Sequence, residues 1–270
     1  MVLLDELSDA GHLIAGGQSL VPTMALRMAA PEVLIDISGV SEMATITESQ
    51  GILCIGAATR YADILASPVV AKTCPLLTQA IPFIAHEAIR NRGTIGGSLA
   101  HADPAAELPG CMLALNARIV VQSVGGQRKI PAEEFFLGTY LTALRAGELI
   151  VSVEIPKIAD DEHHLFRELT RRSGDYAMLG VAFVIGMDDI AIKHARLAYF
   201  SVGDRALLAN EAAASLFGFT PTPELFDGCA AKAAHQLDCL GDLYNSAAMK
   251  RHLVKTLTRR VLGALLTEPD

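Results

Sequence analysis

Several residue types are scarce in this 270-residue sequence. It has no tryptophan, and aromatic residues make up only 5% of it. Its five cysteines are scattered, and no two have the close spacing of zinc or iron–sulfur motifs, so no metal site is expected. An odd number of scattered thiols favours reduced cysteines and a cytoplasmic location. The cysteines are Cys54, Cys74, Cys111, Cys229 and Cys239.

Positive charge and long apolar runs are also scarce. The chain has 22 basic and 30 acidic residues, and its net charge of -8 argues against a nucleic-acid or anionic-membrane partner. No apolar stretch approaches the roughly 20 residues that span a bilayer, so no membrane span is expected. The first ten residues lack the basic region and cleavage site of a signal peptide. With 51% hydrophobic residues, the chain can bury a sizeable core.

The hydrophobic periodicity predicts an α+β chain with two parts. A polar, charged segment at 157–164 marks a boundary between domains. Before it, we expect strands at 12–15, 33–37, 52–57, 118–123 and 149–155, and helices at 3–7, 20–28, 63–66, 75–89 and 104–115. After it, we expect strands at 165–170, 180–187 and 193–202, and helices at 205–217, 223–236 and 246–266, the last with Ser246 as N-cap.

Two glycine-rich turns carry the strongest chemical signal. The first is Ala15-Gly16-Gly17-Gln18-Ser19, and the second is Thr94-Ile95-Gly96-Gly97-Ser98. Glycine lets backbone N–H groups approach a diphosphate closely, and a helix that begins at the turn adds a favourable dipole. Either turn alone is equally consistent with an ordinary tight turn. Neither has the G-x-G-x-x-G pattern, and the residues alone do not name a cofactor.

Longer stretches around these turns resemble a known family. Residues 15–22, followed by Leu26-Arg27 and 34–37, resemble the first flavin motif of the medium subunit of the carbon monoxide dehydrogenase and xanthine dehydrogenase families. Residues 90–107 are similar to the second motif throughout, and 171–177 to a third segment. The resemblance covers nearly the whole chain. It implies an FAD-binding domain of the vanillyl-alcohol-oxidase (PCMH) type at 1–157, then a smaller α+β domain of the CO dehydrogenase flavoprotein type, with an antiparallel sheet and helices, at 163–268.

The resemblance also implies a role and partners. In such molybdenum hydroxylases, which are heterotrimers, a large molybdopterin subunit hydroxylates the substrate and a small subunit holds two 2Fe-2S clusters. The medium subunit would take electrons from those clusters on noncovalently bound FAD and pass them to an external acceptor. No catalytic residue is expected in this chain. Relatives usually begin about 10 to 20 residues earlier, which suggests a shortened N-terminus.

The family motifs assign residues to the cofactor. The first motif contributes to the diphosphate cradle Ile14, Ala15, Gly16, Gly17, Gln18, Ser19, Leu20 and Val21. The second contributes Thr94, Ile95, Gly96, Gly97 and Ser98, where Ser98 replaces the commoner Asn. Asp103 and Glu107 would lie near the adenosine or ribityl hydroxyls. Ile150 would pack on the flavin, Arg167 occupies a position where many relatives have Lys, and Tyr176 would lie close to the isoalloxazine ring.

Two other functions remain open on sequence grounds. A stand-alone flavin oxidoreductase of the same fold would act without partners, and a non-enzymatic assembly or cofactor-insertion protein would not need the flavin. If only one turn touches the cofactor, the longer match favours the second. His163-His164 is interpreted as solvated linker, and His101 as either a cofactor contact or a loop residue bonded to the backbone.

Overall fold

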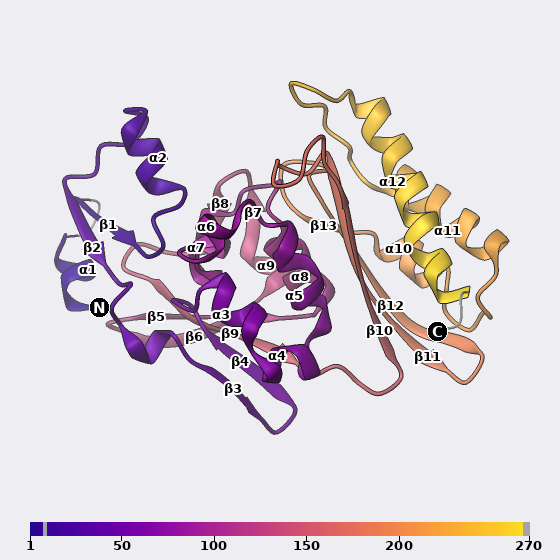
Figure 1. The fold of residues 1–270 in the computed structure, drawn as a ribbon, viewed down its shortest axis with the longest axis horizontal. Coiled ribbons are helices and arrows are strands. Elements are labelled where there is room, and N and C mark those ends of the chain that lie inside the picture. Colours follow the sequence, from indigo (N-terminus) through magenta and orange to yellow (C-terminus); the bar gives the residue numbers. More distant parts are fainter. Residues whose placement is uncertain (8–9, 267–270) are drawn as a thin grey trace.

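The computed structural model describes residues 1–7 and 10–266. Three parts follow one another along its long axis, as Figure 1 shows: a small N-terminal part, a five-stranded sheet with helices, and a four-stranded sheet with helices on its outer face. The expected end of the second domain, residue 268, lies outside the described residues. Among those residues, no helix is both long and apolar enough to cross a membrane.

The N-terminal part is a small parallel pair of strands with two short helices. Its elements are α1 (Val2–Leu7), β1 (Gly11–Ile14), α2 (Leu20–Ala25) and β2 (Val33–Asp36). Strands β1 and β2 pair in parallel, and the first glycine turn connects β1 to α2. The turn therefore lies at the carboxyl end of a strand and opens a helix, where a phosphate site is expected.

The five-stranded sheet is antiparallel throughout. Its strands, in spatial order, are β3 (Ile46–Ser49), β4 (Ile52–Gly56), β9 (Leu149–Pro156), β5 (Arg118–Ser123) and β6 (Gly126–Pro131). The helices of this part are α3 (Tyr61–Ala66), α4 (Pro68–Thr73), α5 (Pro75–Ala80), α6 (Glu87–Arg90), α7 (Ile95–His101), α8 (Glu107–Ala114) and α9 (Ala132–Phe135). Short segments complete it: 3-10 turns at Ser41–Met43 and Ile81–Phe83, and the pair β7 (Phe136–Gly138) and β8 (Leu141–Thr142). Every residue of α8 is buried, which makes this helix the centre of the core.

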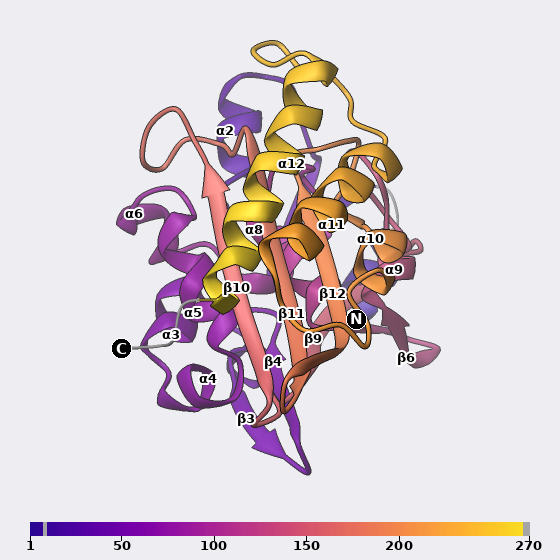
Figure 2. The same cartoon turned by 90° about the vertical axis from the view of Figure 1, so that its right-hand side faces the viewer.

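The C-terminal sheet is also antiparallel, in the order β10 (Glu162–Leu169), β11 (Leu179–Asp188), β12 (Ala191–Phe200) and β13 (Leu207–Leu208). Its helices are α10 (Asn210–Ala214), α11 (Pro223–Gln236) and α12 (Ala247–Leu262), followed by a 3-10 turn at Gly263–Leu266. Figure 2 shows α11 and α12 lying across one face of the sheet. Ser246 caps α12 as expected, because its Oγ accepts a hydrogen bond from the Met249 N–H.

The other face of the C-terminal sheet packs on the five-stranded part. Phe166 of β10 lies 5.3 Å from Phe83 and 5.8 Å from Phe200, centroid to centroid. The Phe200 ring fills the space beside two glycines, Gly110 of α8 and Gly180 of β11, where a Cβ would collide with it. With both faces covered, the middle of β11 has no exposed residue, as its continuous apolar sequence indicates.

Three predicted helices are wrong in extent. The one at 75–89 breaks after Ala80, because Pro82 cannot donate a backbone hydrogen bond and Ala85 has a left-handed φ of 44°. The one at 104–115 begins only at Glu107, since Asp103 Oδ1 accepts the Ala105 N–H in a local turn. Within 205–217, β13 first pairs with β12, and only the short α10 follows.

The polar segment at 157–164 is also shorter than predicted, since β10 begins at Glu162. His164 is 7% exposed, so its interpretation as solvated linker is wrong. Its Nδ1 accepts the Leu76 N–H at 3.2 Å, and its carbonyl accepts Gln79 Nε2 at 2.9 Å. Burial lowers the pKa of His164 to about 4, so the ring stays neutral and can accept. The sequence also missed β3 and β6, whose residues are mostly polar and exposed.

Candidate functional site

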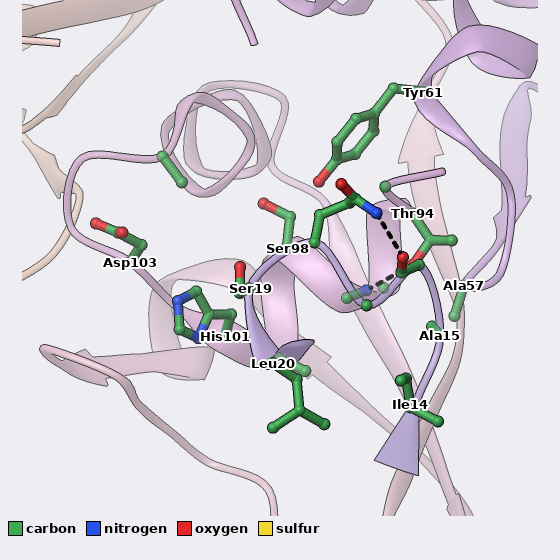
Figure 3. A pocket seen from close by; sticks show the side chains of 18 of the residues that line it. Ile14, Ala15, Ser19, Leu20, Ala57, Tyr61, Thr94, Ser98, His101 and Asp103 are labelled. Carbon is green, nitrogen blue, oxygen red and sulfur yellow. Dashed lines mark hydrogen bonds between the residues drawn. The ribbon is translucent and has the colours of Figure 1, made fainter. Parts of the chain in front are cut away.

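One cavity of about 600 Å³ lies between the N-terminal part, α7, the start of α8 and the loop that joins β10 to β11. Both glycine turns line it, although about 80 residues separate them in sequence (Figure 3). Its volume is within the range of cavities that hold a large cofactor, roughly 300–1,000 Å³. The fold therefore brings the two motifs to a single site.

The first turn (residues 15–19) leaves its backbone donors unused. Among the described residues, no acceptor bonds the backbone N–H groups of Gly16, Gly17, Gln18 or Ser19. Gly17 has φ of 70°, a conformation that glycine adopts without strain. The Gln18 side chain fixes the turn by donating from Nε2 to the Gly16 carbonyl at 2.9 Å. A row of free N–H groups at the start of a helix is suited to an anion.

The second turn (residues 94–98) uses its donors inside the protein. The Ile95 N–H bonds the Thr59 carbonyl at 3.1 Å, and the Gly96 N–H bonds the Ala57 carbonyl at 2.8 Å. Thr94 caps α7, since its Oγ1 accepts the Gly97 N–H at 3.2 Å. The Ser98 N–H bonds the Thr94 carbonyl at 3.1 Å. This turn presents the exposed backbone of Gly97 and the side-chain hydroxyls of Thr94 and Ser98 to the cavity.

The first turn contacts the backbone just before the second turn, at Arg92 and Gly93. A Cβ on Gly16 would collide with the carbonyl of Arg92, and it would lie 2.8 Å from Gly93 Cα. Gly93 in turn has the Tyr61 ring 2.5 Å from where its own Cβ would be. The first turn therefore packs on the backbone that leads into the second, and this contact requires glycine at position 16, whereas the Tyr61 ring requires it at position 93.

The cavity wall is acidic and has no strong cation. The described residues that line it include Asp103, Glu107, Glu148 and Asp175, and none is Lys or Arg. Burial and, to a lesser extent, the nearby Asp103 raise the pKa of Glu107 to about 7. Burial also raises the pKa of Tyr61 to about 12, and its hydroxyl points toward Ser98 in Figure 3. An anion bound here must be held by backbone N–H groups and hydroxyls.

The cavity brings together most of the residues assigned from sequence. Those that line it are Ile14, Ala15, Gly16, Gly17, Gln18, Ser19, Leu20, Thr94, Gly96, Gly97, Ser98, Asp103, Glu107, Ile150 and Tyr176. Three do not line it. Val21 is half exposed on α2, Ile95 is fully buried beneath the second turn, and Arg167 is exposed on β10, where it donates to the Phe166 carbonyl.

A strand explains the position of Arg167. Successive side chains of a strand point to opposite faces, so His164, Phe166 and Glu168 share one face of β10 and Arg167 takes the other. His164 and Phe166 pack toward the five-stranded part. Glu168 therefore points toward the core behind the cavity, and Arg167 points away from it.

Two further lining residues, Tyr61 and Ala57, belong to no sequence motif and precede the second turn by more than 30 residues. A Cβ on Gly96 would lie 2.5 Å from Ala57 Cβ, so Gly96 packs directly against Ala57. Only contacts across the fold identify these two residues. His101, which belongs to the second motif, also lines the cavity, and its ring lies 4.8 Å from that of Tyr140, centroid to centroid. Within the described part of the chain, no cluster of His, Cys, Asp or Glu could hold a metal ion.

The geometry fits a dinucleotide such as FAD. The four N–H groups of the first turn have no acceptor among the described residues and can serve as an anion cradle. Ile150 on β9 lines the same cavity and adds an apolar side chain to its wall. The side-chain hydroxyls and carboxyls of the lining suit the hydroxyls of a ribityl or ribose chain.

Comparisons with known proteins agree with this fit. The model of the FAD binding domain in molybdopterin dehydrogenase matches residues 2–158, and that of the CO dehydrogenase flavoprotein C-terminal domain matches residues 164–265. Subunit alpha of the 6-hydroxypseudooxynicotine dehydrogenase complex of Paenarthrobacter nicotinovorans is 39% identical over 98% of this chain and 90% of its own length. The carbon monoxide dehydrogenase medium chain of Hydrogenophaga pseudoflava is 36% identical over 98% and 92%.

Solved structures show the same relationship. The structure of carbon monoxide dehydrogenase from Hydrogenophaga pseudoflava that lacks the Mo-pyranopterin moiety contains a chain that superposes with a TM-score of 0.95 at 38% identity, over 97% of this chain and 92% of that one. A chain of quinoline 2-oxidoreductase from Pseudomonas putida 86 superposes with a TM-score of 0.91 at 38% identity, over 97% and 90%.

Fold and site together define a flavoprotein subunit of an oxidoreductase, with an FAD-binding domain followed by an α+β C-terminal domain. The chain belongs to the family of FAD-binding medium subunits of molybdenum hydroxylases, the family of the carbon monoxide dehydrogenase medium chain. Its cofactor is FAD, and complexes of this family hold molybdopterin and iron–sulfur clusters in other subunits.

Proposed function

We propose that this chain takes electrons from iron–sulfur clusters of a small partner subunit on FAD and passes them to an external acceptor. A large molybdopterin subunit would hydroxylate the substrate in the same heterotrimer. FAD supplies the chemistry, since it exchanges electrons singly or in pairs. This chain supplies the binding site and its electrostatics. The names of relatives as subunits of dehydrogenase complexes support this assignment.

The observation that carries the proposal is the first turn. Four adjacent residues whose N–H groups have no acceptor among the described residues line a cavity whose described lining contains no Lys or Arg. A diphosphate carries negative charge, and such N–H groups can meet it at close range without a side-chain cation. We assign the diphosphate to Gly16, Gly17, Gln18 and Ser19, with Ser98 and Thr94 contributing hydroxyls from the opposite side.

We assign the remaining contacts by position in the cavity. Ile150 would pack against the flavin ring, and Asp103 and Glu107 would accept hydrogen bonds from sugar or ribityl hydroxyls. Tyr176 is 74% exposed at the rim. A ring beside it would lie close to the surface, where a partner's cluster could approach.

Reconstitution tests the flavin site. The full chain, freed of flavin and mixed with FAD, should retain the cofactor's absorbance at about 450 nm after gel filtration. Acid precipitation should release that flavin into the supernatant, because the site is proposed to be noncovalent. Absence of bound flavin after reconstitution would contradict the assignment and favour an assembly protein of the same fold.

Assembly with partners tests electron transfer. In the purified heterotrimer, adding the substrate of the molybdopterin subunit should bleach the flavin absorbance within the turnover time. The isolated chain with FAD should show no such bleaching. Turnover by the isolated chain with its own substrate would instead establish the alternative, a stand-alone flavin oxidoreductase.

Two further assignments accompany this function. We propose that the chain divides into an FAD-binding domain at 1–157 and a C-terminal domain at 163–268. We also propose a cytoplasmic location, supported by five cysteines that are all free, including Cys54, which is partly exposed.

A further inference from the structure

Two carboxyl groups lie in the wall behind the cavity without a cation between them. Glu107 begins α8, lines the cavity and is nine-tenths buried. Glu168 of β10 has an oxygen, Oε2, that is sealed from solvent. Among the described residues, it is the single buried side-chain nitrogen or oxygen with no hydrogen-bond partner. An ionised carboxylate in that position would be costly, whereas a carboxylic acid is tolerated.

The charge of Glu107 acts on Glu168. Burial and, to a lesser extent, this charge raise the pKa of Glu168 to about 8. The groups that face the pair from neighbouring elements are acidic or neutral: Asp103 before α8, Tyr61 of α3, Cys111 of α8, Cys74 before α5, and Tyr176 of the loop after β10. Burial keeps the Cys74 and Cys111 thiols protonated by raising the pKa of both.

No compensating cation is present. In the described part of the chain, no salt bridge involves Glu107 or Glu168. Within the same described residues, the one hydrogen bond to the Glu107 carboxyl comes from its own backbone N–H. Two buried carboxylates that repel one another cannot both ionise cheaply, so one proton stays with them at neutral pH. A diphosphate entering the same cavity adds negative charge and makes the loss of that proton still more costly.

We propose that Glu107 and Glu168 form a proton-holding pair, so that this chain binds its flavin dinucleotide with uptake of a proton onto the pair. The proposal rests on the proposed function only in taking FAD as the ligand. The step balances simply: FAD and one proton from solvent enter, and a carboxylate of the pair becomes a carboxylic acid. Glu168 touches no ligand in this scheme and acts through Glu107, so it is a positioning residue.

Calorimetry measures this proton directly. Binding of FAD to the flavin-free full chain is measured at pH 8 in two buffers with different ionisation enthalpies. The difference in heat gives the protons exchanged. We expect uptake of between about half a proton and one proton, because the free pair is partly ionised at that pH. The affinity for FAD should also fall as the pH rises from 8 to 9, toward tenfold per unit for one linked proton.

Variants assign the proton to the pair. Glu168→Gln should reduce proton uptake at pH 8 and weaken the pH dependence of the affinity, because it removes the carboxyl with the higher pKa. Glu107→Gln should also reduce both, because it removes the charge that acts on Glu168. Glu224→Gln, at an exposed position on α11 far from the cavity, is the matched control and should keep the uptake of the original chain.

The outcomes separate this inference from the function. FAD binding without proton uptake at pH 8, or unchanged uptake in Glu168→Gln, overturns the pair and leaves the flavin site intact. If neither variant folds, the buffer experiment on the unaltered chain still decides. Failure of the unaltered chain to bind FAD at any pH overturns the flavin assignment and the pair together.

Discussion

The turn at 15–19 and the turn at 94–98 face the same cavity with similar sequences, yet their backbone donors have opposite fates. In the first turn, four N–H groups lack an acceptor among the described residues. In the second, N–H groups are bonded to Thr59, Ala57 and Thr94. A Gly-Gly pair can therefore serve binding or serve packing. Only the surrounding fold decides which, because Ala57 and Thr59 supply their carbonyls from 37 and 35 residues before Thr94.

The largest effect is expected from Gly96→Ala in the second turn. Its Cβ would lie 2.5 Å from Ala57 Cβ and 2.7 Å from the Ala57 carbonyl, which is backbone and cannot move aside. Overpacking of this kind costs about 1–3 kcal/mol, so the Tm should fall by several degrees, and FAD binding should weaken with it. Gly228→Ala in α11 meets no atom within 4 Å and should not lower the Tm. A variant Gly96→Ala with an unchanged Tm would contradict the structural role of this turn.

Gly17→Ala, in the first turn, should affect the affinity for FAD more than the stability of the fold. At φ of 70° an alanine costs about 1–2 kcal/mol, and the strain would disturb the free N–H groups. We expect the affinity for FAD, measured by fluorescence titration, to fall about tenfold, as 1.4 kcal/mol at the site implies. Gly51→Ala is the matched control, with φ of 76° in the open turn between β3 and β4. It should lose similar stability and keep the affinity. Equal affinities in both variants would argue against the first turn as the cradle.

Thr94→Ala removes the cap of α7 without adding bulk. Loss of such a cap costs about 1 kcal/mol, because the Gly97 N–H loses the Thr94 Oγ1 acceptor. Denaturant unfolding should show the loss, and Thr94→Ser should restore most of it. If Thr94→Ala weakens FAD binding more than it lowers stability, the threonine hydroxyl contributes to the cradle directly.

The smallest effect is expected from Gln18→Ala. It removes the Nε2 bond to the Gly16 carbonyl, which contributes about 0.5–1.5 kcal/mol to the shape of the first turn. The affinity for FAD should fall a few-fold while the Tm stays within a degree or two. Gln127→Ala, at an exposed position on β6, should change neither quantity. A larger loss of Tm than of affinity would place this side chain in the packing of the fold.

The sequence predicts an element correctly where residues close along the chain determine its structure. The spacing of apolar residues predicted α12 with Ser246 as its cap, and the apolar run predicted β11. Residues Asp103, Glu107 and Ile150 were assigned to the cofactor by resemblance, and all three line the cavity. That they and the motif residues contact FAD stays a prediction.

The sequence was uninformative where a contact comes from far along the chain. The buried state of His164 depends on the Leu76 N–H, 88 residues away. The second turn was favoured over the first because its motif is longer, whereas its donors are occupied by the protein. The sequence does not distinguish Glu168 from Arg167, since only the register of β10 shows which of the two side chains faces the core.

The ring of Phe200 lies against Gly110 of α8 and Gly180 of β11 and stacks on Phe166. These residues come from both sides of the proposed domain boundary, so neither half can lose its structure without exposing aromatic surface of the other. The free energies of unfolding of the two halves are thereby linked. A calorimetric scan of the full chain should show one cooperative transition, and a chain cut between 157 and 162 should yield fragments that aggregate when separated.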